Sequence, residues 1–483
     1  MEQVAYASAR GRWVLLAAVL GSGLALLDST IVNIALPALG EDLDAGFDGL
    51  QWTVNGYVLS LAALILLGGA LGDLLGRRRV FLVGTVWFAV ASVLCGLAPS
   101  VEVLVAARVL QGVGGALLTP GSLAMIAAAF APEDRAKAVG AWSGLGGIAA
   151  AVGPFVGGLL VEVSWRLVFL VNVPLAVLVV VVTLRHVPES RDEELDPRLD
   201  VAGAALGALG LAGLTYGLVG AGERGLSAVE AAGLALGVLL LAAFVLVEHR
   251  SSHPMLPLDV FSSRQFTAAN LVTFAVYAAL GTVFLLLVLQ LQVVAGFAPL
   301  AAGTALLPVT ACMLLLSARA GGLAARIGPR LPMTLGPLVA GAGVLLLSRI
   351  GPGAAYAADV LPGAVLLGLG LSLTVAPLTA TVLAAAPARH AGVASGVNNA
   401  VARTAGLLAV AVLPLVAGLS GDDYTDPAAF DGGYRTALRI AAGLLVVGGL
   451  LALATVRDEG RAPRPDRRTH CAVDGPPVEP APA

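Results

Sequence analysis

The chain is a succession of long apolar runs separated by short segments rich in charged residues, proline and glycine. Most runs reach the ~20 residues that a helix needs to cross a bilayer, and they are continuous rather than alternating, which excludes a transmembrane β-barrel. The first run is too long for a signal peptide and lacks a clear cleavage site, so we expect it to be retained. The breaks predict fourteen spanning helices, near 13–37, 51–72, 80–98, 102–130, 137–161, 167–187, 201–221, 228–248, 266–291, 299–319, 331–349, 360–385, 391–418 and 434–456.

Composition agrees with an all-α polytopic membrane protein. Of the 483 residues, 58% are hydrophobic and only 12% are charged, whereas an average soluble domain is about 25% charged. The net charge of −3 gives no signature of nucleic-acid binding. The three cysteines are scattered and indicate neither a disulfide framework nor a metal site. Lys137 is the only lysine and does not belong to a Walker A loop, so the chain has no nucleotide-driven motor of its own.

The basic residues predict the orientation. If the fourteen spans alternate, most of the 28 Arg and Lys residues fall on the side of the N-terminus. The positive-inside rule therefore predicts a multi-pass protein of the cell membrane with both termini in the cytoplasm. The polar segment 185–200 is expected to be a cytoplasmic connector, and the tail from residue 457 is rich in Pro, Arg and Asp and is expected to be disordered.

A specific motif follows the second span. The loop GALGDLLGRRRVF (69–81) places Asp73 at a helix end, Gly76 at a tight turn, and Arg77 directly after it. A basic loop is what the positive-inside rule already requires here. The spacing is more specific, because an Asp beside arginines can hold a neighbouring helix end by charge and helix dipole. Such a latch could form in one conformation and break in another.

A fainter copy of this loop indicates an internal duplication. GGLAARIGPR (321–330) aligns Gly321 with Gly69, Leu323 with Leu71 and Gly328 with Gly76, but has Ala325 in the place of Asp73. Both copies follow the second span of a six-span set. We therefore expect an N-terminal six-helix bundle (1–189), a connector with two extra spans (190–262), a C-terminal six-helix bundle (263–456) and the tail (457–483). Paired repeats with a binding site between them are a transporter architecture.

Two opposite charges lie inside predicted spans. Asp28, in LDSTIVNIALP (27–37), is ~13 Å from the outer end of its helix, and Arg108, in LVAARVLQGVGGA (104–116), is ~9 Å deep. We expect them to interact directly or through Gln111 and water, because an isolated charge at that depth is costly. A purely structural ion pair is the alternative. A functional role is favoured, because ionisable residues inside a membrane are functional by default. A motion that changes the distance to Arg108 would shift the pKa of Asp28 and so couple the pair to protons.

The fifth span is rich in small residues. In 140–160, Gly153 and Gly157, and likewise Pro154 and Gly158, are spaced by four, which allows close helix packing. Pro154 also bends the helix. Ordinary packing and a gating role explain this spacing equally well.

A few polar side chains within the spans are candidates for the substrate cavity, although hydrogen bonds between helices explain those of the second half equally well. Arg403 is the least explained, because it is ~18 Å into its span and needs a partner or water. The candidates are Asn33, Gln111, Asn172, Gln290, Asn398 and Arg403.

Together these segments resemble the fourteen-span drug:proton antiporter branch of the major facilitator superfamily, over nearly the whole chain. The loop 69–81 resembles the shared superfamily motif, 108–116 the proton-coupling Arg motif, 153–158 the antiporter motif and 27–37 the signature of the branch. The resemblance implies two pseudo-symmetric bundles with two helices between them, export driven by the proton gradient without a cofactor, and a monomer. The chain departs from the pattern at Ala149, where a glycine is usual. The span 299–319 also has no carboxylate, whereas some exporters of dicationic drugs carry one in their second half.

The leading hypothesis is a proton-coupled exporter of small amphipathic compounds that works by alternating access. Its partners would be the substrate, protons and the lipid bilayer, and no nucleic acid. A proton symporter of the same fold is one alternative, against which Gly153 and Pro154 speak. An integral-membrane enzyme would need a reactive side-chain cluster facing one surface. A channel would lack a steep dependence of flux on the proton gradient.

Overall fold

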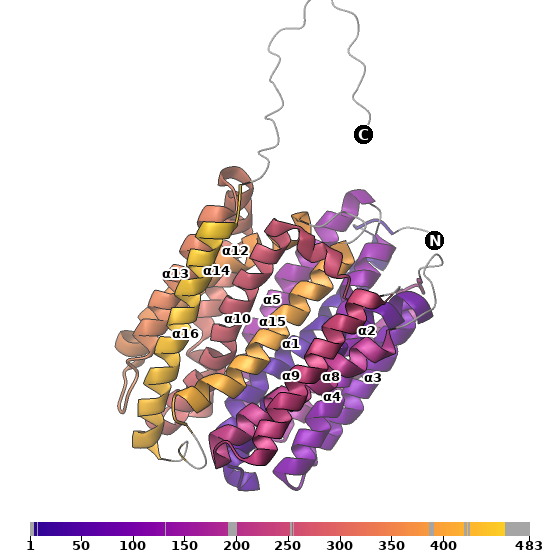
Figure 1. Ribbon diagram of the computed structural model, residues 1–483. Helices are drawn as coiled ribbons and strands as arrows, with labels where there is room; N and C mark the ends of the chain where they lie inside the picture. The colour runs from indigo at the N-terminus through magenta and orange to yellow at the C-terminus, as the bar shows by residue number, and fades with distance from the viewer. Residues whose placement is uncertain are drawn as a thin grey trace, which may run out of the picture.

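The computed structural model of the chain describes residues 4–6, 8–130, 132–191, 200–251, 254, 256–385, 391–419, 423 and 426–458. The regular secondary structure of these residues is helical, apart from one isolated β-bridge between Val4 and Phe130. The long helices run side by side, and α1 begins at the same face at which α16 ends (Figure 1). We call this face the terminal face and the opposite one the far face.

The first seven helices pack together and are called the N-terminal group. Helices α2 and α3 both pack on α4, and α1 packs on α4 and α5. A helix satisfies its backbone hydrogen bonds internally, which is what an apolar run requires inside a membrane. The elements are α1 (Ala9–Leu43), α2 (Phe47–Leu75), α3 (Arg77–Gly96), α4 (Val101–Ala129), α5 (Pro132–Val163), α6 (Leu167–Leu170) and α7 (Asn172–His186).

The helices from α10 onward form the C-terminal group. Helix α10 packs on α15 and α16, and α14 packs on α12 and α13. Two short π-helices, η2 and η3, extend spans of this group at the far face. The elements are η1 (Leu258–Ser262), α10 (Arg264–Leu289), η2 (Gln290–Val294), α11 (Pro299–Thr304), α12 (Leu307–Ile327), α13 (Arg330–Leu347), η3 (Tyr356–Val360), α14 (Leu361–Ala384), α15 (Ala391–Val416) and α16 (Pro427–Thr455).

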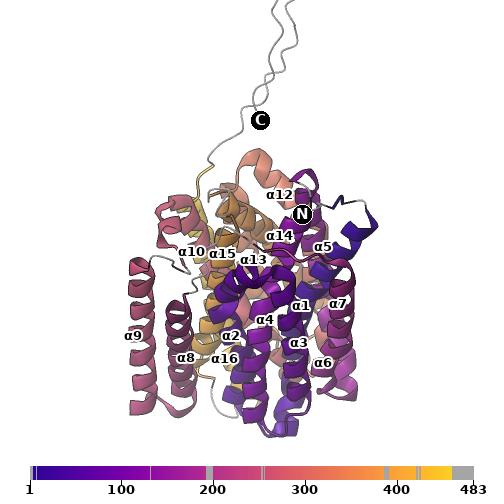
Figure 2. The same cartoon turned by 90° about the vertical axis from the view of Figure 1, so that its right-hand side faces the viewer.

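A hairpin of two helices, α8 (Val201–Arg224) and α9 (Ala228–Arg250), stands at the edge of the molecule (Figure 2). Helix α8 packs on α2 and on α15, so it contacts both groups, whereas α9 packs mainly on α8. Glycines make the close approach possible, since a Cβ atom on Gly213 would meet the backbone of Gly237 at 3.1 Å. The two extra helices therefore flank the line where the groups meet.

Each of the fourteen expected spans coincides with helical structure. Counted over the described residues, thirteen helices are long and apolar enough to cross a membrane, and Val152–Val163, the end of α5, is a shorter apolar helix. Two spans are interrupted: 167–187 is divided into α6 and α7, and 299–319 into α11 and α12. A proline explains each interruption, because proline has no N–H to bond to the carbonyl four residues earlier. For Pro174 and Pro308 that carbonyl belongs to the last residue of α6 and of α11, respectively.

Parts of two expected polar segments lie outside the described residues. These are 192–199 of the connector and everything after Asp458 in the tail.

Candidate functional site

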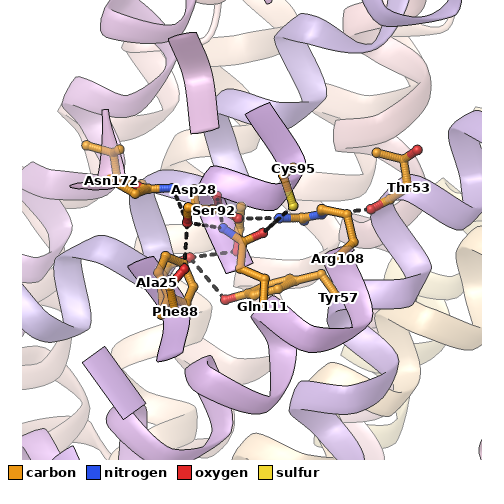
Figure 3. A network of polar contacts seen from close by, with 12 residues as sticks. Ala25, Asp28, Thr53, Tyr57, Phe88, Ser92, Cys95, Arg108, Gln111 and Asn172 are labelled. Atoms are coloured by element: carbon orange, nitrogen blue, oxygen red, sulfur yellow. Dashed lines mark hydrogen bonds and ion pairs between the residues drawn. The ribbon is translucent and has the colours of Figure 1, made fainter. Parts of the chain in front are cut away.

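The N-terminal group holds a buried ion pair. Asp28 lies in α1 and Arg108 in α4, and Arg108 Nη1 donates to Asp28 Oδ2 at 2.6 Å. The Asp28 side chain is fully buried, and Arg108 is 1% exposed. The structure thus brings together the two charges whose depths in the sequence suggest a pairing, and their contact is direct (Figure 3).

Two amides complete the coordination of the carboxylate. Asp28 Oδ1 accepts hydrogen bonds from Gln111 Nε2 at 2.8 Å and from Asn172 Nδ2 at 2.9 Å. Both amides also donate to Ser92 Oγ, at 2.9 and 3.3 Å. Ser92 is not recognisable from the sequence, because a lone serine in an apolar helix carries no pattern. Only the packing of α3 against α4 and α7 reveals that it holds the two amides in place.

The guanidinium of Arg108 has further partners that do not depend on Asp28. Its Nε donates to the carbonyl of Thr53 at 2.9 Å, and its Nη1 to Gln111 Oε1 at 2.5 Å. It also lies over the ring of Tyr57, 4.4 Å from the centroid, and 5.8 Å from that of Phe169. Aromatic faces attract cations electrostatically. The positive charge therefore keeps stabilising contacts even when the carboxylate is neutral.

This network changes the interpretation of two substrate-cavity candidates. Gln111 and Asn172 are fully buried and bonded to Asp28, so the structure places them in the ion-pair network. All members come from the N-terminal group. Such a satisfied buried pair is sensitive to loss of either partner, since removing one charge leaves the other uncompensated at a cost of about 3–5 kcal/mol.

The small residues of α5 allow it to contact two other helices closely. On one side, a Cβ atom at Gly157 would lie 3.2 Å from Ile31 Cα, and one at Gly153 would overlap Thr30 of the same helix, α1. On the other side, a Cβ atom at Gly158 would lie 2.5 Å from Leu300 Cα in α11. The carbonyl of Pro154 in turn contacts Gly303 of α11. The segment 153–158 is thus the place where α1, α5 and the C-terminal group meet.

The two groups are joined near the far face. Among the described residues, two hydrogen bonds cross between them: Gln51 Nε2 donates to the carbonyl of Val410 at 2.7 Å, and Gln292 Nε2 to that of Ile34 at 3.1 Å. Gln51 lies in the first turns of α2, just after the far-face turn, and Gln292 lies in η2. Together with the contact of α5 and α11, they close the molecule at the far face.

At the terminal face, the motif loop is organised by a second acidic residue. Asp73 Oδ1 pairs with Arg77 Nε at 2.7 Å, within the same loop. Gly76 has φ of 111° and packs against Glu189, which follows α7. Glu189 Oε1 accepts from the backbone N–H of Arg78 at 3.1 Å, at the beginning of α3. The contact from the loop to another helix end is therefore made by Glu189, while Asp73 holds the loop itself.

The fainter copy of the loop has the same arrangement. Gly328 has φ of 96°, and Asp458, which follows α16, accepts from the backbone N–H of Arg330 at 3.0 Å. In both groups an acid after the last helix caps the helix that follows the glycine turn, where the helix dipole favours negative charge. The repeat of the glycines is visible in the sequence, but the two acids are distant in the chain and only the fold pairs them.

The remaining polar candidates are distributed differently. Gln290 is fully buried and donates to the carbonyl of Ile350 and to Asp431 Oδ1, both at 2.7 Å, so it joins helices of the C-terminal group. Asn398 is half-buried and donates to Asn270 and Thr273 of α10, at 3.1 and 2.8 Å. Asn33 is half-buried and makes no side-chain hydrogen bond among the described residues.

Arg403 lies in the middle of α15 and is half-buried. Within the described part of the chain, no carboxylate lies within ion-pairing distance of it. Helix α15 packs on α10 of its own group and on α2 of the N-terminal group, so Arg403 lies on a helix at the boundary between the two groups. It therefore has no counter-ion there, unlike Arg108.

Comparisons with known proteins give a consistent result. A sequence model described as the Major Facilitator Superfamily matches residues 18–410. The chain is 38% identical over 423 residues to the tetracenomycin C resistance and export protein of Streptomyces glaucescens, covering 86% of this chain and 78% of that protein. It is 37% identical over 457 residues to a puromycin resistance protein of Streptomyces alboniger, covering 91% and 90% of the two chains.

Solved structures share the fold at low identity. The inward open conformation of the xylose transporter XylE from E. coli superposes with a TM-score of 0.64 at 16% identity, covering 93% of this chain and 97% of that one. At this identity the likeness concerns the arrangement of the helices alone. Among the described residues no group of three His, Cys, Asp or Glu side chains could hold a metal ion.

Proposed function

The chain belongs to the Major Facilitator Superfamily, and from this premise we propose that it exports small amphipathic compounds in exchange for protons by alternating access. It is a multi-pass membrane transporter and not an enzyme, and its relatives include proteins named for antibiotic resistance and export. Their names support drugs, antibiotics or a secondary metabolite as the exported compounds. We propose that the proton gradient is the energy source and that no cofactor takes part.

The observation that carries the proton coupling is the fully buried pair of Asp28 and Arg108. Ionised Asp28 accepts three hydrogen bonds, one of them from a cation. Protonation removes the negative charge and weakens the contact to Arg108, whose other contacts to Thr53, Gln111 and Tyr57 remain. The ion pair can therefore open while the guanidinium of Arg108 keeps its other favourable contacts. Protonation of Asp28 would then release α1 from α4.

Helix α1 connects this site to the far-face closure. Thr30 and Ile31 contact the glycines of α5, and Ile34 accepts the hydrogen bond from Gln292. Ile34 is six residues from Asp28, a distance of ~9 Å along the helix. A shift of α1 that follows protonation would therefore disturb the contacts that join the two groups. We assign Gly153, Pro154, Gly157 and Gly158 to this gating step.

At the terminal face, the loop with Asp73, Gly76 and Arg77 is proposed to latch the state that is open at the far face. In the present structure Glu189 fixes the beginning of α3 and contacts Gly76, which holds this loop in one shape within the N-terminal group. The moving units of the proposal are residues 1–189 and 263–456, joined by the connector 190–262. We propose that the terminal face, which carries the arginine-rich loop, faces the cytoplasm of the cell, and that the protein acts as a monomer.

The test is substrate-coupled proton uptake in proteoliposomes, with Asp28→Asn as the variant. We expect the exchange of protons for substrate to be lost while the variant still binds substrate. Asp44→Asn is the matched control, because Asp44 is an exposed carboxylate at the far end of the same helix. Its left-handed backbone (φ 49°) is also favourable for asparagine.

Full coupled uptake by Asp28→Asn would refute the role of this carboxylate. Substrate accumulation in cells rather than depletion would favour a symporter of the same fold. An efflux-deficient host challenged with a panel of toxic compounds identifies what is exported.

A further inference from the structure

Arg403, an arginine within the C-terminal group that has no ion pair among the described residues, has no role in the coupling mechanism described above. Arg403 is 12 residues from the first residue of α15, about 18 Å along the helix, and so close to the middle of the membrane. An uncompensated guanidinium at this depth costs several kcal/mol unless it contacts water or an anion. Such a residue marks a substrate or ion pathway by default.

The position of Arg403 on α15 directs its side chain toward the boundary between the N-terminal and C-terminal groups. Leu407, one turn along α15, packs in a cluster with Leu59 of α2, and Ala400, one turn before, packs against the core of the N-terminal group. Residues three and four apart share a face of a helix, so Arg403 looks toward α2 rather than toward lipid. Helix α15 itself packs on α2 and on α10.

The charges of the described helices leave this region positive. Asp28 is the only carboxylate in the middle of a described helix, and it is paired with Arg108. The other described acids inside helices, such as Asp73, Asp359 and Asp431, lie within a few residues of helix ends. Asp28, Arg108 and Arg403 together therefore carry one net positive charge when Asp28 is ionised, and two when it is protonated.

We propose that Arg403 recognises an acidic group on the exported compound, so that the substrates are amphipathic weak acids such as carboxylic acids and acidic phenols. This inference rests on the proposed export function. A guanidinium is planar, permanently charged and able to bind a carboxylate or phenolate through two N–H groups. A cationic compound would instead meet an uncompensated like charge, which is disfavoured in a low dielectric.

The charge on the substrate changes the energetics of transport. If one proton enters for each monoanion that leaves, two positive charges move inward per cycle. Both the pH gradient and the membrane potential then drive export. Exchange of one proton for a monocation would move no net charge and would respond to the pH gradient alone.

The experiment uses two dyes with the same xanthene ring system, fluorescein as the anion and rhodamine 123 as the cation, in proteoliposomes with an imposed pH gradient. We expect the wild type to transport fluorescein, and to transport it faster when a membrane potential is added. Arg403→Gln should reduce fluorescein transport at least tenfold and leave rhodamine 123 transport equal or higher. Arg403→Lys, which keeps the charge but not the planar fork, should lie between the two.

The matched control is Arg349→Gln, which removes an exposed arginine just after the end of α13 in the same group. It should transport both dyes like the wild type. A direct titration of each dye with purified protein separates loss of binding from a folding defect, because Arg403→Gln should still bind rhodamine 123 as well as the wild type does.

Three results would overturn the inference. Preference of the wild type for rhodamine 123, or an equal effect of Arg403→Gln on both dyes, refutes recognition of an acidic group but leaves the export function standing. If the protein transports neither dye, nor any compound against which it protects cells, in response to a proton gradient, the export function itself is refuted and the inference with it.

Discussion

The contact between Gly158 in α5 and Leu300 in α11 gives a prediction about the conformational equilibrium. In Gly158→Ala the new Cβ atom would lie 2.5 Å from Leu300 Cα and 3.1 Å from Leu300 N. Carbon atoms in contact are separated by about 3.5–4.0 Å. The two backbones must therefore move apart by roughly 1–1.5 Å, and no side-chain rotation can relieve the overlap because the atoms belong to the main chain.

This overlap destabilises the state that is closed at the far face. Overpacking of this kind costs about 1–3 kcal/mol. In a state in which α5 and α11 separate, the methyl group has room and this cost is absent. At 1.4 kcal/mol per factor of ten, the equilibrium should shift toward opening of the far face by about 5- to 150-fold.

Distances between spin labels measure this shift. Suitable positions are Leu97 and Pro352, two exposed residues after α3 and α13 at the far face, changed to cysteine in a background without the native cysteines. We expect Gly158→Ala to populate longer distances. Gly443→Ala is the control, since its Cβ atom would meet nothing within 4 Å. Identical distance distributions in both variants would show that the α5–α11 contact does not determine closure.

Two further predictions concern the charged sites. Glu189→Gln should lower the unfolding free energy by about 0.5–2 kcal/mol, measured by thermal unfolding in detergent, because it weakens the negative charge at the beginning of α3 and the pair with Arg79. An unchanged midpoint would contradict a capping role. Arg108→Lys should lose proton coupling although it keeps the charge, because an ammonium cannot bond to Thr53 and Gln111 while it lies over Tyr57. Coupled proton uptake at the wild-type rate would show that charge alone is sufficient.

The sequence by itself determined the number and approximate bounds of the spanning helices, because the apolar runs must match the thickness of a bilayer. It also indicated that Asp28 and Arg108 interact, since two opposite charges at similar depth in an apolar medium have few other partners. The glycines at 76 and 328 were recognisable as a repeat because their spacing to the neighbouring helices is fixed locally.

Only the tertiary structure decided which side chains complete these sites. Ser92 and Tyr57 come from other helices and Glu189 from the segment after α7, and none carries a sequence pattern, so their contacts depend on how the helices are packed. The same packing buried Gln111 and Asn172 against Asp28, while it left Arg403 between the groups without a described counter-ion. The physical reason is that helical periodicity defines the faces of each helix, whereas the choice of neighbour for each face depends on side chains distant in the chain.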